Sequence, residues 1–484
     1  MTNDELYTLF LKAEEAERSK MLLDPANFQV LKERLGEACF QQLNSLAEKT
    51  SKHTNSAHLG ASDSPNLIFI PGIMGSLLEP TFGGGIWWLD AARALDRINF
   101  LGLDPDGEDP ADPTRSATPC AVDLTYTGFL NAAVMEPGIL PVKFPYDWRK
   151  SLRKSVAGLV QLIQSTWERN GNKPVHLVAH SMGGLLVRTM LISHATALKK
   201  FLGKIVFIAT PHYGSPIIAY YLREHIRGTW MMWTLGKYLE PETFRSLWGV
   251  MNLLPAPTGI YPGSRGNESK HPCLNFDCYR AEAWRLDLSY TASSRFQLAL
   301  DDAATLHREL YDSHSTLDED LLRSMLMIVG VGYSLPFRVE VQPGIVSGWR
   351  TVATFDRSIG TQNYEGDGSV PVASACLESV ETRYVKGEHA ALPNIPAVYD
   401  DVFRFLADKP RLLSTKADGA LGGHLGPIAS NSTIGFVDQS SATDPRFTTA
   451  NRWSIPEPSP EDFEQIERQL RAGQLPDFQF TRIM

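Results

Sequence analysis

The stretch PVHLVAHSMGGLLVRTM, residues 174–190, decides how the rest of the chain is interpreted. Its apolar run over residues 175–179 predicts a buried strand, and the segment after the Gly183-Gly184 pair has the spacing of an amphipathic helix. Ser181 lies where the strand would end and the helix begin. Serines often cap helices, so one hypothesis makes Ser181 an ordinary N-cap. The other makes it a nucleophile on a sharp strand-to-helix turn.

A serine that attacks an acyl group needs its hydroxyl clear of the sheet, a base within reach and backbone N–H groups for the oxyanion. In such a turn the residue after the serine starts the helix, so the N–H of Met182 has no helical acceptor. The flanking positions must be small, as Ala179 and Gly183 are. The familiar pattern G-x-S-x-G has glycine where this chain has Ala179, which weakens the motif without excluding it.

The acid and the base are sought downstream, because the chain order in this arrangement is serine, acid, histidine. Asp367 lies between two glycines in YEGDGSVP, and Asp356 in TFDRS is the alternative acid. Only two histidines follow. His389 comes after the last predicted core strand and before a helix, where a base would reach the serine, whereas His424 lies in a glycine-rich tail. The alternative for His389 is an ordinary loop histidine.

A second oxyanion donor should come from a loop after an early strand, and IPGIMGS at residues 70–76 has that form. Gly72 and Gly75 permit the turn, and the N–H of Ile73 or Met74 would point at the site.

Two other histidines lie close to these motifs. His180 precedes the serine but leaves the turn in another direction, so we expect a supporting role at most. His212 ends the next strand, where we expect it to line the pocket.

The pattern from residue 140 to 407 alternates apolar strands with helices, which indicates an α/β class with a parallel sheet covered on both faces. Three parts are predicted: an N-terminal helical extension (1–60), a catalytic domain (61–407) and a loop-rich tail (408–484) with a short helix. The expected strands are 140–148, 175–179, 204–210, 326–332 and 383–387, and residues 66–76 are expected to form a buried strand that runs into a glycine turn. The expected helices are 150–170, 183–198, 292–313 and 395–407.

An inserted segment at about 211–290 breaks this rhythm and is expected to form a cap. Aromatic residues and methionines crowd residues 226–255. Trp230, Trp233 and Trp248 would suit an acyl chain, because flexible and aromatic side chains often line apolar pockets. The alternative is that they form only the buried core of the cap.

The composition of the chain limits the classes of partner that it could bind. The 484 residues are 43% hydrophobic with a net charge of −9, and no Lys/Arg run is long enough for nucleic acid. Neither a secretory signal nor an apolar run of about 18 residues is seen, so we expect a cytoplasmic protein with at most peripheral membrane contact.

The cysteines and acidic residues do not have the spacing of a disulfide framework or of a metal site. Five cysteines at irregular spacing argue against a disulfide framework. His271, Cys273 and Cys278 lack an evident fourth zinc ligand. The acidic loop at 104–112 lacks the ligand pattern of a calcium loop and is expected to be a solvated turn. We therefore expect no metal and no cofactor.

Taken together, these motifs resemble the lecithin:cholesterol acyltransferase family, which includes lysosomal phospholipase A2 and phospholipid:diacylglycerol acyltransferase. IPGIMGS, WWLD, FPYDWR, AHSMGG, TPHYGS, EGDGSVP and GEHAALP occur in the family's order over residues 65–405. The resemblance implies an α/β-hydrolase fold. It also implies these roles: Ser181 as nucleophile, Asp367 as acid, His389 as base, and the N–H groups of Ile73 and Met182 as the oxyanion hole.

The resemblance also accounts for smaller features. Alanine is common in this family at the position of Ala179. In PYDWR, Asp147 and Arg149 are expected to pair, while Tyr146 and Trp148 wall the site. The chain differs from secreted members in lacking a signal peptide and the disulfide of their lid. We expect the substrate to contact Met74, Trp148, His212, Trp230, Trp233 and Trp248.

Three hypotheses about function follow. The first is a lipase, phospholipase or O-acyltransferase that takes a lipid-like ester, forms an acyl-enzyme and passes the acyl group to water or a hydroxyl acceptor. The second keeps the chemistry but acts as a thioesterase, amidase or cyclising acyltransferase on a small metabolite. The third is a non-catalytic scaffold with a hydrolase fold. Oligomeric state is not set by the sequence.

Overall fold

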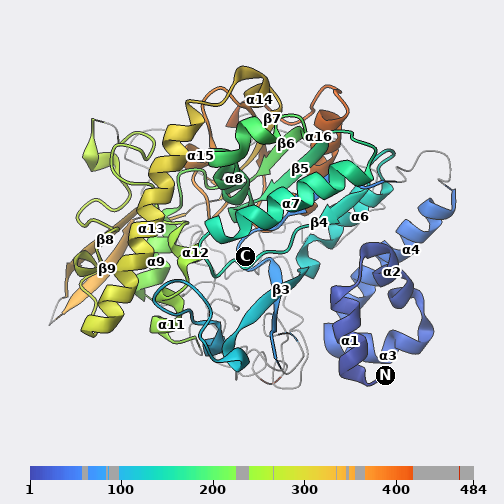
Figure 1. Cartoon of the computed structure of the whole chain (residues 1–484), viewed down its shortest axis with the longest axis horizontal. Coiled ribbons are helices and arrows are strands. Elements are labelled where there is room, and N and C mark those ends of the chain that lie inside the picture. The colour runs from blue at the N-terminus through green and yellow to red at the C-terminus, as the bar shows by residue number, and fades with distance from the viewer. Residues whose placement is uncertain are drawn as a thin grey trace, which may run out of the picture.

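A computed structural model describes residues 1–56, 64–82, 86, 98–224, 239–264, 266–333, 335–344, 348–354, 366–417 and 468. Its centre is a six-stranded sheet in the order β10-β7-β6-β5-β1-β4 with parallel pairing throughout (Figure 1). The predicted α/β-hydrolase class with a mostly parallel sheet is therefore confirmed. The strands are β1 (Leu67–Ile70), β4 (Pro141–Lys143), β5 (Val175–His180), β6 (Leu202–Ile208), β7 (Met325–Val331) and β10 (Glu381–Lys386).

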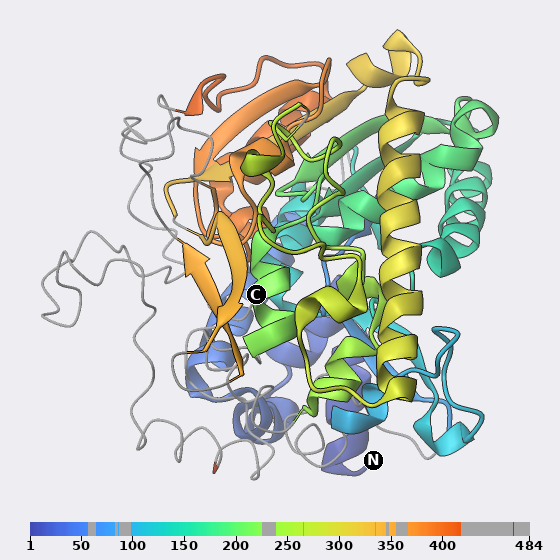
Figure 2. The ribbon, with the colours of Figure 1, turned by 90° about the vertical axis from the view of Figure 1, so that its left-hand side faces the viewer.

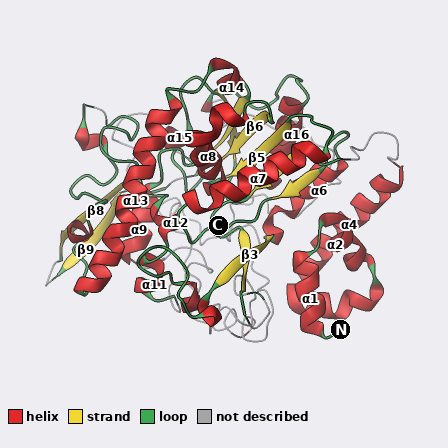
Figure 3. Cartoon of the chain, viewed as in Figure 1, coloured by secondary structure: helices red, strands yellow, loops and turns green. Residues whose placement is uncertain are grey.

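Helices cover both faces of this sheet, as strands that are apolar on both sides require (Figure 3). Alternate residues of a strand enter two separate cores. Leu177 packs in one core with residues of α7 (Arg153–Arg169), α8 (Met182–Leu198) and α13 (Tyr290–His314). Val178 packs in the other with residues of α6 (Thr127–Met135) and α16 (Pro396–Leu406).

The strand predicted for residues 140–148 is correct only for its first part, because β4 ends at Lys143. Pro145 has no N–H to offer a neighbouring strand. The N–H of Tyr146 donates instead to the hydroxyl of Ser76, at 3.0 Å, and the chain turns at Asp147. The predicted strand thus becomes a buried turn beside β1.

The N-terminal helices form a group at one end of the molecule (Figure 1, blue). Asp24 accepts the N–H of Ala26, at 3.0 Å, and so caps the short helix η1 (Pro25–Asn27). Lys143 of β4 forms ion pairs with Glu14 and Glu15, which join the group to the sheet. These elements are α1 (Asn3–Lys12), α2 (Glu15–Leu23), η1 (Pro25–Asn27), α3 (Phe28–Leu35) and α4 (Glu37–Ser56).

Two antiparallel pairs stand apart from the main sheet: β2 (Ser76–Pro80) with β3 (Ala117–Val122), and β8 (Arg338–Pro343) with β9 (Trp349–Thr354). Figure 2 shows the second pair as an orange hairpin. Within the described residues, no helix has the length and apolar character needed to cross a membrane. Shorter helices are α9 (Pro216–Glu224), α11 (Pro241–Arg245), α12 (Trp248–Met251), α14 (Glu319–Arg323), α15 (Val372–Ala375), η2 (Ile98–Leu101), η3 (Pro113–Arg115), η4 (Leu124–Tyr126), η5 (Glu268–Lys270), η6 (Ala281–Trp284) and η8 (Leu392–Asn394).

Candidate active site

Ser181 lies on a strained turn between β5 and α8. Its backbone has φ 51° and ψ −125°, a conformation that non-glycine residues rarely adopt. Ser181 stands at the N-cap position of α8, but its side chain makes no capping hydrogen bond to the helix, so it does not act as an ordinary capping serine. A Cβ at Gly183 would overlap the carbonyl oxygen of Pro71, and one at Gly184 would overlap the hydroxyl of Thr210. The glycine pair therefore lets α8 start against two neighbouring strands.

The hydroxyl of Ser181 begins a line of hydrogen bonds. Its Oγ lies 2.8 Å from Nε2 of His389, whose Nδ1 lies 2.7 Å from Oδ2 of Asp367. All three residues are buried, with exposed fractions of 4%, 6% and 1%. The second carboxylate oxygen, Oδ1, accepts the N–H groups of Ser369 and Val370, at 3.0 and 2.7 Å. The carboxylate is thus held in one orientation toward the imidazole.

The loops after β7 and β10 bring the acid and the histidine together. Gly330 of β7 has no side chain, and a Cβ there would lie 2.6 Å from Cβ of Asp367. The N–H of His389 donates to the carbonyl of Asp367, at 2.9 Å, which ties the two loops directly. The alternative residues Asp356 and His424 lie outside the described residues.

The loop after β1 approaches the serine from the other side. It turns between Gly72 and Gly75, where the N–H of Gly75 donates to the carbonyl of Gly72 at 3.1 Å. Met74 in this turn has φ 59°. A Cβ at Gly72 would lie 3.0 Å from Cβ of Ser181, so Ile73 follows a point of close backbone approach. Met182 is the first residue of α8, where backbone N–H groups lack a helical acceptor.

His180 and Tyr126 lie beneath these loops. Tyr126 accepts the N–H of Gly72 at 2.9 Å, and its hydroxyl lies 2.9 Å from Nδ1 of His180. Nε2 of His180 lies 3.0 Å from the carbonyl oxygen of His389. Tyr126 was not among the sequence candidates, because it belongs to no motif and lies 55 positions before the serine in the chain.

The residues expected to contact substrate differ in their neighbours and hydrogen bonds. Trp148 is fully buried and its indole N–H donates to the carbonyl of Ser76, at 3.2 Å. Trp248 packs against Gly107, where an added Cβ would lie 2.7 Å from its ring. In the described part of the chain, neither ring nitrogen of His212 has a hydrogen-bond partner. Trp230 and Trp233 lie outside the described residues.

The inserted segment after β6 docks close to the serine. The N–H of Gly249 in α12 donates to the carbonyl of Arg149, at 2.8 Å. A Cβ at Gly249 would lie 2.8 Å from the terminal methyl of Met182 and would overlap the carbonyl oxygen of Trp148. The segment therefore contacts the residue that follows Ser181.

Arg149 and Asp147 pair, as the resemblance implies. The guanidinium makes two hydrogen bonds to Asp147, at 2.9 and 2.7 Å, and a third to Asp109 at 2.7 Å. Burial opposes the charged form, but the two carboxylates outweigh it and raise the pKa of Arg149. The acidic loop is therefore not simply a solvated turn as expected, because Asp109 and Glu108 pair with Arg149 and Lys150.

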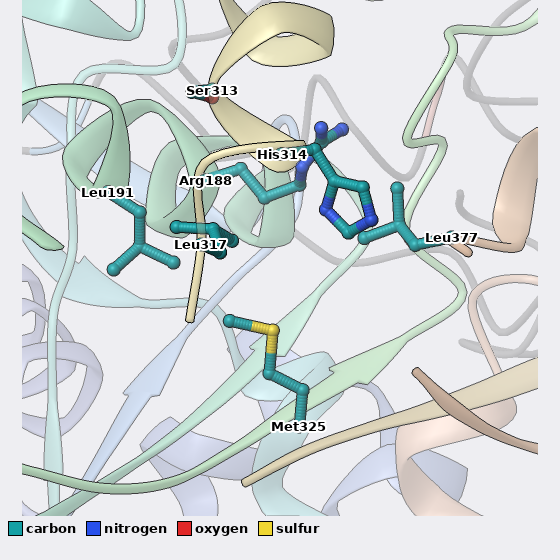
Figure 4. A pocket seen from close by; sticks show the side chains of 7 residues that line it. All are labelled: Arg188, Leu191, Ser313, His314, Leu317, Met325 and Leu377. Atoms are coloured by element: carbon teal, nitrogen blue, oxygen red, sulfur yellow. The ribbon is translucent and has the colours of Figure 1, made fainter. Parts of the chain in front are cut away.

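A small cavity lies away from this site, between α8, α13 and the start of β7 (Figure 4). Its space of about 10 Å³ suits roughly one water molecule. Arg188, His314, Met325 and Leu377 are among its lining residues. Met325 is the first residue of β7, so the cavity lies at the edge of the sheet opposite to Ser181.

Among the described residues, no three His, Cys, Asp or Glu side chains are grouped so that they could hold a metal ion. Nε2 of His271 lies 2.8 Å from the carbonyl oxygen of Ala256, and Nδ1 accepts the N–H of Cys273 at 3.1 Å. Both ring nitrogens therefore have partners within the protein.

Comparison with known proteins points to one family. Residues 134–265 match the family described as lecithin:cholesterol acyltransferase. Phospholipase A(1) LCAT3 of Arabidopsis thaliana is 26% identical over 313 residues, which cover 56% of this chain and 67% of that protein. Lecithin-cholesterol acyltransferase-like 4 of the same plant is 29% identical over 120 residues, covering 24% of this chain and only 21% of that protein.

Solved structures show lower similarity. The Tle4–Tli4 complex contains a chain that is 14% identical, with coverage of 72% of this chain and 97% of that one and a TM-score of 0.49. The propeptide form of the Bacillus licheniformis lipase BlEst2 is 13% identical, with coverage of 74% and 54% and a TM-score of 0.36. The family match and the Arabidopsis relatives confirm the resemblance stated from the motifs.

Proposed function

We propose that this chain, a member of the lecithin:cholesterol acyltransferase family, transfers acyl groups through a covalent ester on Ser181. The observation that carries the proposal is the line Ser181–His389–Asp367, with hydrogen bonds of 2.8 and 2.7 Å on a strained turn. An ordinary buried serine has no need of a turn with φ 51°.

In the proposed reaction, Oγ of Ser181 attacks the carbonyl carbon of an ester while its proton passes to Nε2 of His389. Asp367 accepts the Nδ1–H and stabilises the imidazolium. The carbonyl oxygen becomes an oxyanion, which the N–H groups of Ile73 and Met182 would bind. His389 then gives its proton to the departing alcohol. Water or another hydroxyl compound attacks the acyl-enzyme and releases Ser181.

We propose a lipid ester as the substrate. The family match supports this choice, and so does the relative named as a phospholipase A(1). The inserted segment, which is rich in aromatic residues and methionine, contacts Met182 beside the nucleophile. Its apolar side chains would favour an acyl chain over a polar metabolite.

The proposal is tested with a fluorophosphonate probe and a medium-chain nitrophenyl ester. Wild-type protein should be labelled and should release nitrophenol, and Ser181→Ala should lose both, with kcat falling by about 10⁴-fold or more. Ser151→Ala is the matched control, since it removes a buried serine hydroxyl that donates to Asp302. Retained labelling of Ser181→Ala would show that another residue is the nucleophile.

A panel of donors then separates the substrate classes. Phospholipid, simple ester and thioester donors are each assayed with and without an alcohol acceptor. Preference for a thioester or a short polar donor would favour the small-metabolite hypothesis. Failure of the wild-type protein to be labelled would favour the scaffold hypothesis.

A further inference from the structure

Three hydrogen bonds connect Gly72, Tyr126, His180 and the carbonyl of His389, and the donor and acceptor of each can be assigned. Tyr126 already accepts the N–H of Gly72, so its own proton is free to be donated to Nδ1 of His180. Nδ1 is then an acceptor, and the ring proton must be on Nε2. From there it is donated to the carbonyl oxygen of His389, at 3.0 Å. One protonation state thus satisfies all three contacts.

Burial keeps this arrangement neutral. Tyr126 and His180 are each only 1% exposed. Burial lowers the pKa of His180 well below its usual value, and the nearby His389 lowers it further. Burial likewise raises the pKa of Tyr126. The hydrogen bonds therefore keep their directions across the ordinary pH range.

The two loops that His180 and Tyr126 connect carry groups with a role in the proposed reaction. Gly72 directly precedes Ile73, and His389 is the proposed base. The ring centroids of His180 and His389 are 5.0 Å apart, and those of Tyr126 and His180 are 5.6 Å apart. A histidine that only filled the core would have no reason to join these two loops through opposite ring nitrogens.

We propose that Tyr126 and His180 are positioning residues, which hold the Gly72 loop and the His389 loop at a fixed separation on either side of Ser181. This inference rests on the proposed acyl-transfer function. Neither side chain contacts the hydroxyl of Ser181 in the described structure, so both act through other groups. Losing the bridge would let the oxyanion donor and the base shift relative to the nucleophile, while the binding of substrate is unaffected.

The test uses the full chain with Tyr126→Phe, His180→Ala and His180→Gln, assayed on the nitrophenyl ester. For Tyr126→Phe and His180→Ala, kcat should fall by about 10- to 100-fold, since misplacement by about 1 Å has effects of this size. KM should stay within about twofold of the wild-type value, because only interactions made in the transition state are lost. His180→Gln should retain more activity than His180→Ala, because its amide can still donate to the carbonyl of His389.

Two matched controls report on folding alone. Tyr279→Phe removes another buried hydroxyl, which donates to the carbonyl of Pro255 at 2.9 Å. His176→Gln replaces the other histidine of β5, at the opposite end of the strand. Both should keep wild-type kcat even where they lower Tm as much as Tyr126→Phe does.

The outcomes are distinct. The proposal is overturned if Tyr126→Phe and His180→Ala keep more than half of the wild-type kcat. It is also overturned if KM rises in place of the fall in kcat, or if the controls lose as much activity. An unlabelled and inactive wild-type protein would instead remove the proposed function itself, and the positioning roles with it.

Discussion

The two ends of β5 carry the same residue type and have different surroundings. His176 lies near the start of the strand and His180 ends it, four positions later on the same face. Burial lowers the pKa of both, to about 4 for His176. His176 accepts the N–H of Lys204 at 2.9 Å. His180, in contrast, connects two loops through both of its ring nitrogens.

The difference follows from the direction of the strands. All six run parallel, so the loops after β1, β5, β7 and β10 leave the same edge of the sheet. The chain order reverses between β1 and β5, and open α/β sheets bind their ligands at such a point. At the other edge, among the described residues, the charges that act on His176 are those of the Lys204–Asp408 ion pair. The different surroundings of the two histidines therefore follow from their positions at opposite edges of the sheet, and not from the residue type.

The largest difference between the two edges of the sheet is expected when one aspartate at each edge is replaced by asparagine. Asp367→Asn should lower kcat by about 10³- to 10⁴-fold. Its amide oxygen would take the N–H groups of Ser369 and Val370, so its NH₂ would face Nδ1 of His389. Nε2 would then carry the ring proton and could not accept one from Ser181. Steady-state kinetics on the nitrophenyl ester measure the loss.

Asp408→Asn is the control at the amino end. It weakens the ion pair between Lys204 and the exposed carboxylate of Asp408, and it should leave kcat within about twofold, since this pair lies at the opposite edge of the sheet from Ser181. Equal losses in the two variants would show that the carboxyl edge has no special role.

A smaller difference is expected between two glycines. Gly183→Ala would push a methyl into the backbone carbonyls of Ile70 and Pro71, which cannot swing aside. Gly203→Ala would meet the ring of His176 at 2.6 Å, a side chain that can shift. Overpacking costs about 1–3 kcal/mol, and we expect Gly183→Ala near the upper end. Urea unfolding measures both, and a greater loss for Gly203→Ala would contradict this account.

The smallest effect concerns pH and stability. His176 has a pKa of about 4 when folded against a usual value of 6.5. Between these values the unfolded chain binds more protons, so this contribution to stability is present above about pH 6.5 and is lost as the pH falls toward 4. His176→Gln should make the unfolding free energy less sensitive to a change from pH 7 to pH 5, by about 2 kcal/mol.

His180 contributes to the same pH dependence in the same direction, since burial lowers its pKa too. Wild-type protein should therefore lose more stability than His176→Gln over this range in urea titrations at the two pH values. Equal losses would mean that His176 is already solvated in the folded protein.

Much of the fold was predictable from local pattern. The apolar runs at β5, β6 and β7 are buried on both faces, and their predicted bounds differ from the observed ones by at most two residues. The prediction failed at residues 144–148, where apolar and aromatic residues resemble a strand. There the hydroxyl of Ser76, distant in sequence, takes the N–H that a strand would have paired. Such a contact leaves no local signal.

The candidate site likewise contains residues that local pattern predicts and contacts that it does not predict. Small residues mark the predicted turns at Ser181 and Asp367, His389 follows the last predicted core strand, and the order of the three along the chain fits one arrangement. The structure places His389 within hydrogen-bond distance of both Ser181 and Asp367. Glu108 and Asp109 were expected to face solvent, because the sequence does not show that the loop folds back onto Arg149 and Lys150.

The sequence by itself indicated most of the elements, the resemblance to one family and the residues proposed for the chemistry, because hydrophobic periodicity, glycine positions and motif order are local properties. Only the tertiary structure decided which distant groups meet. Tyr126 reaches His180, and His180 reaches the carbonyl of His389, across 54 and 209 positions of chain. These contacts depend on how parallel strands are ordered in the sheet and on which loops then converge. No spacing along the chain records that order.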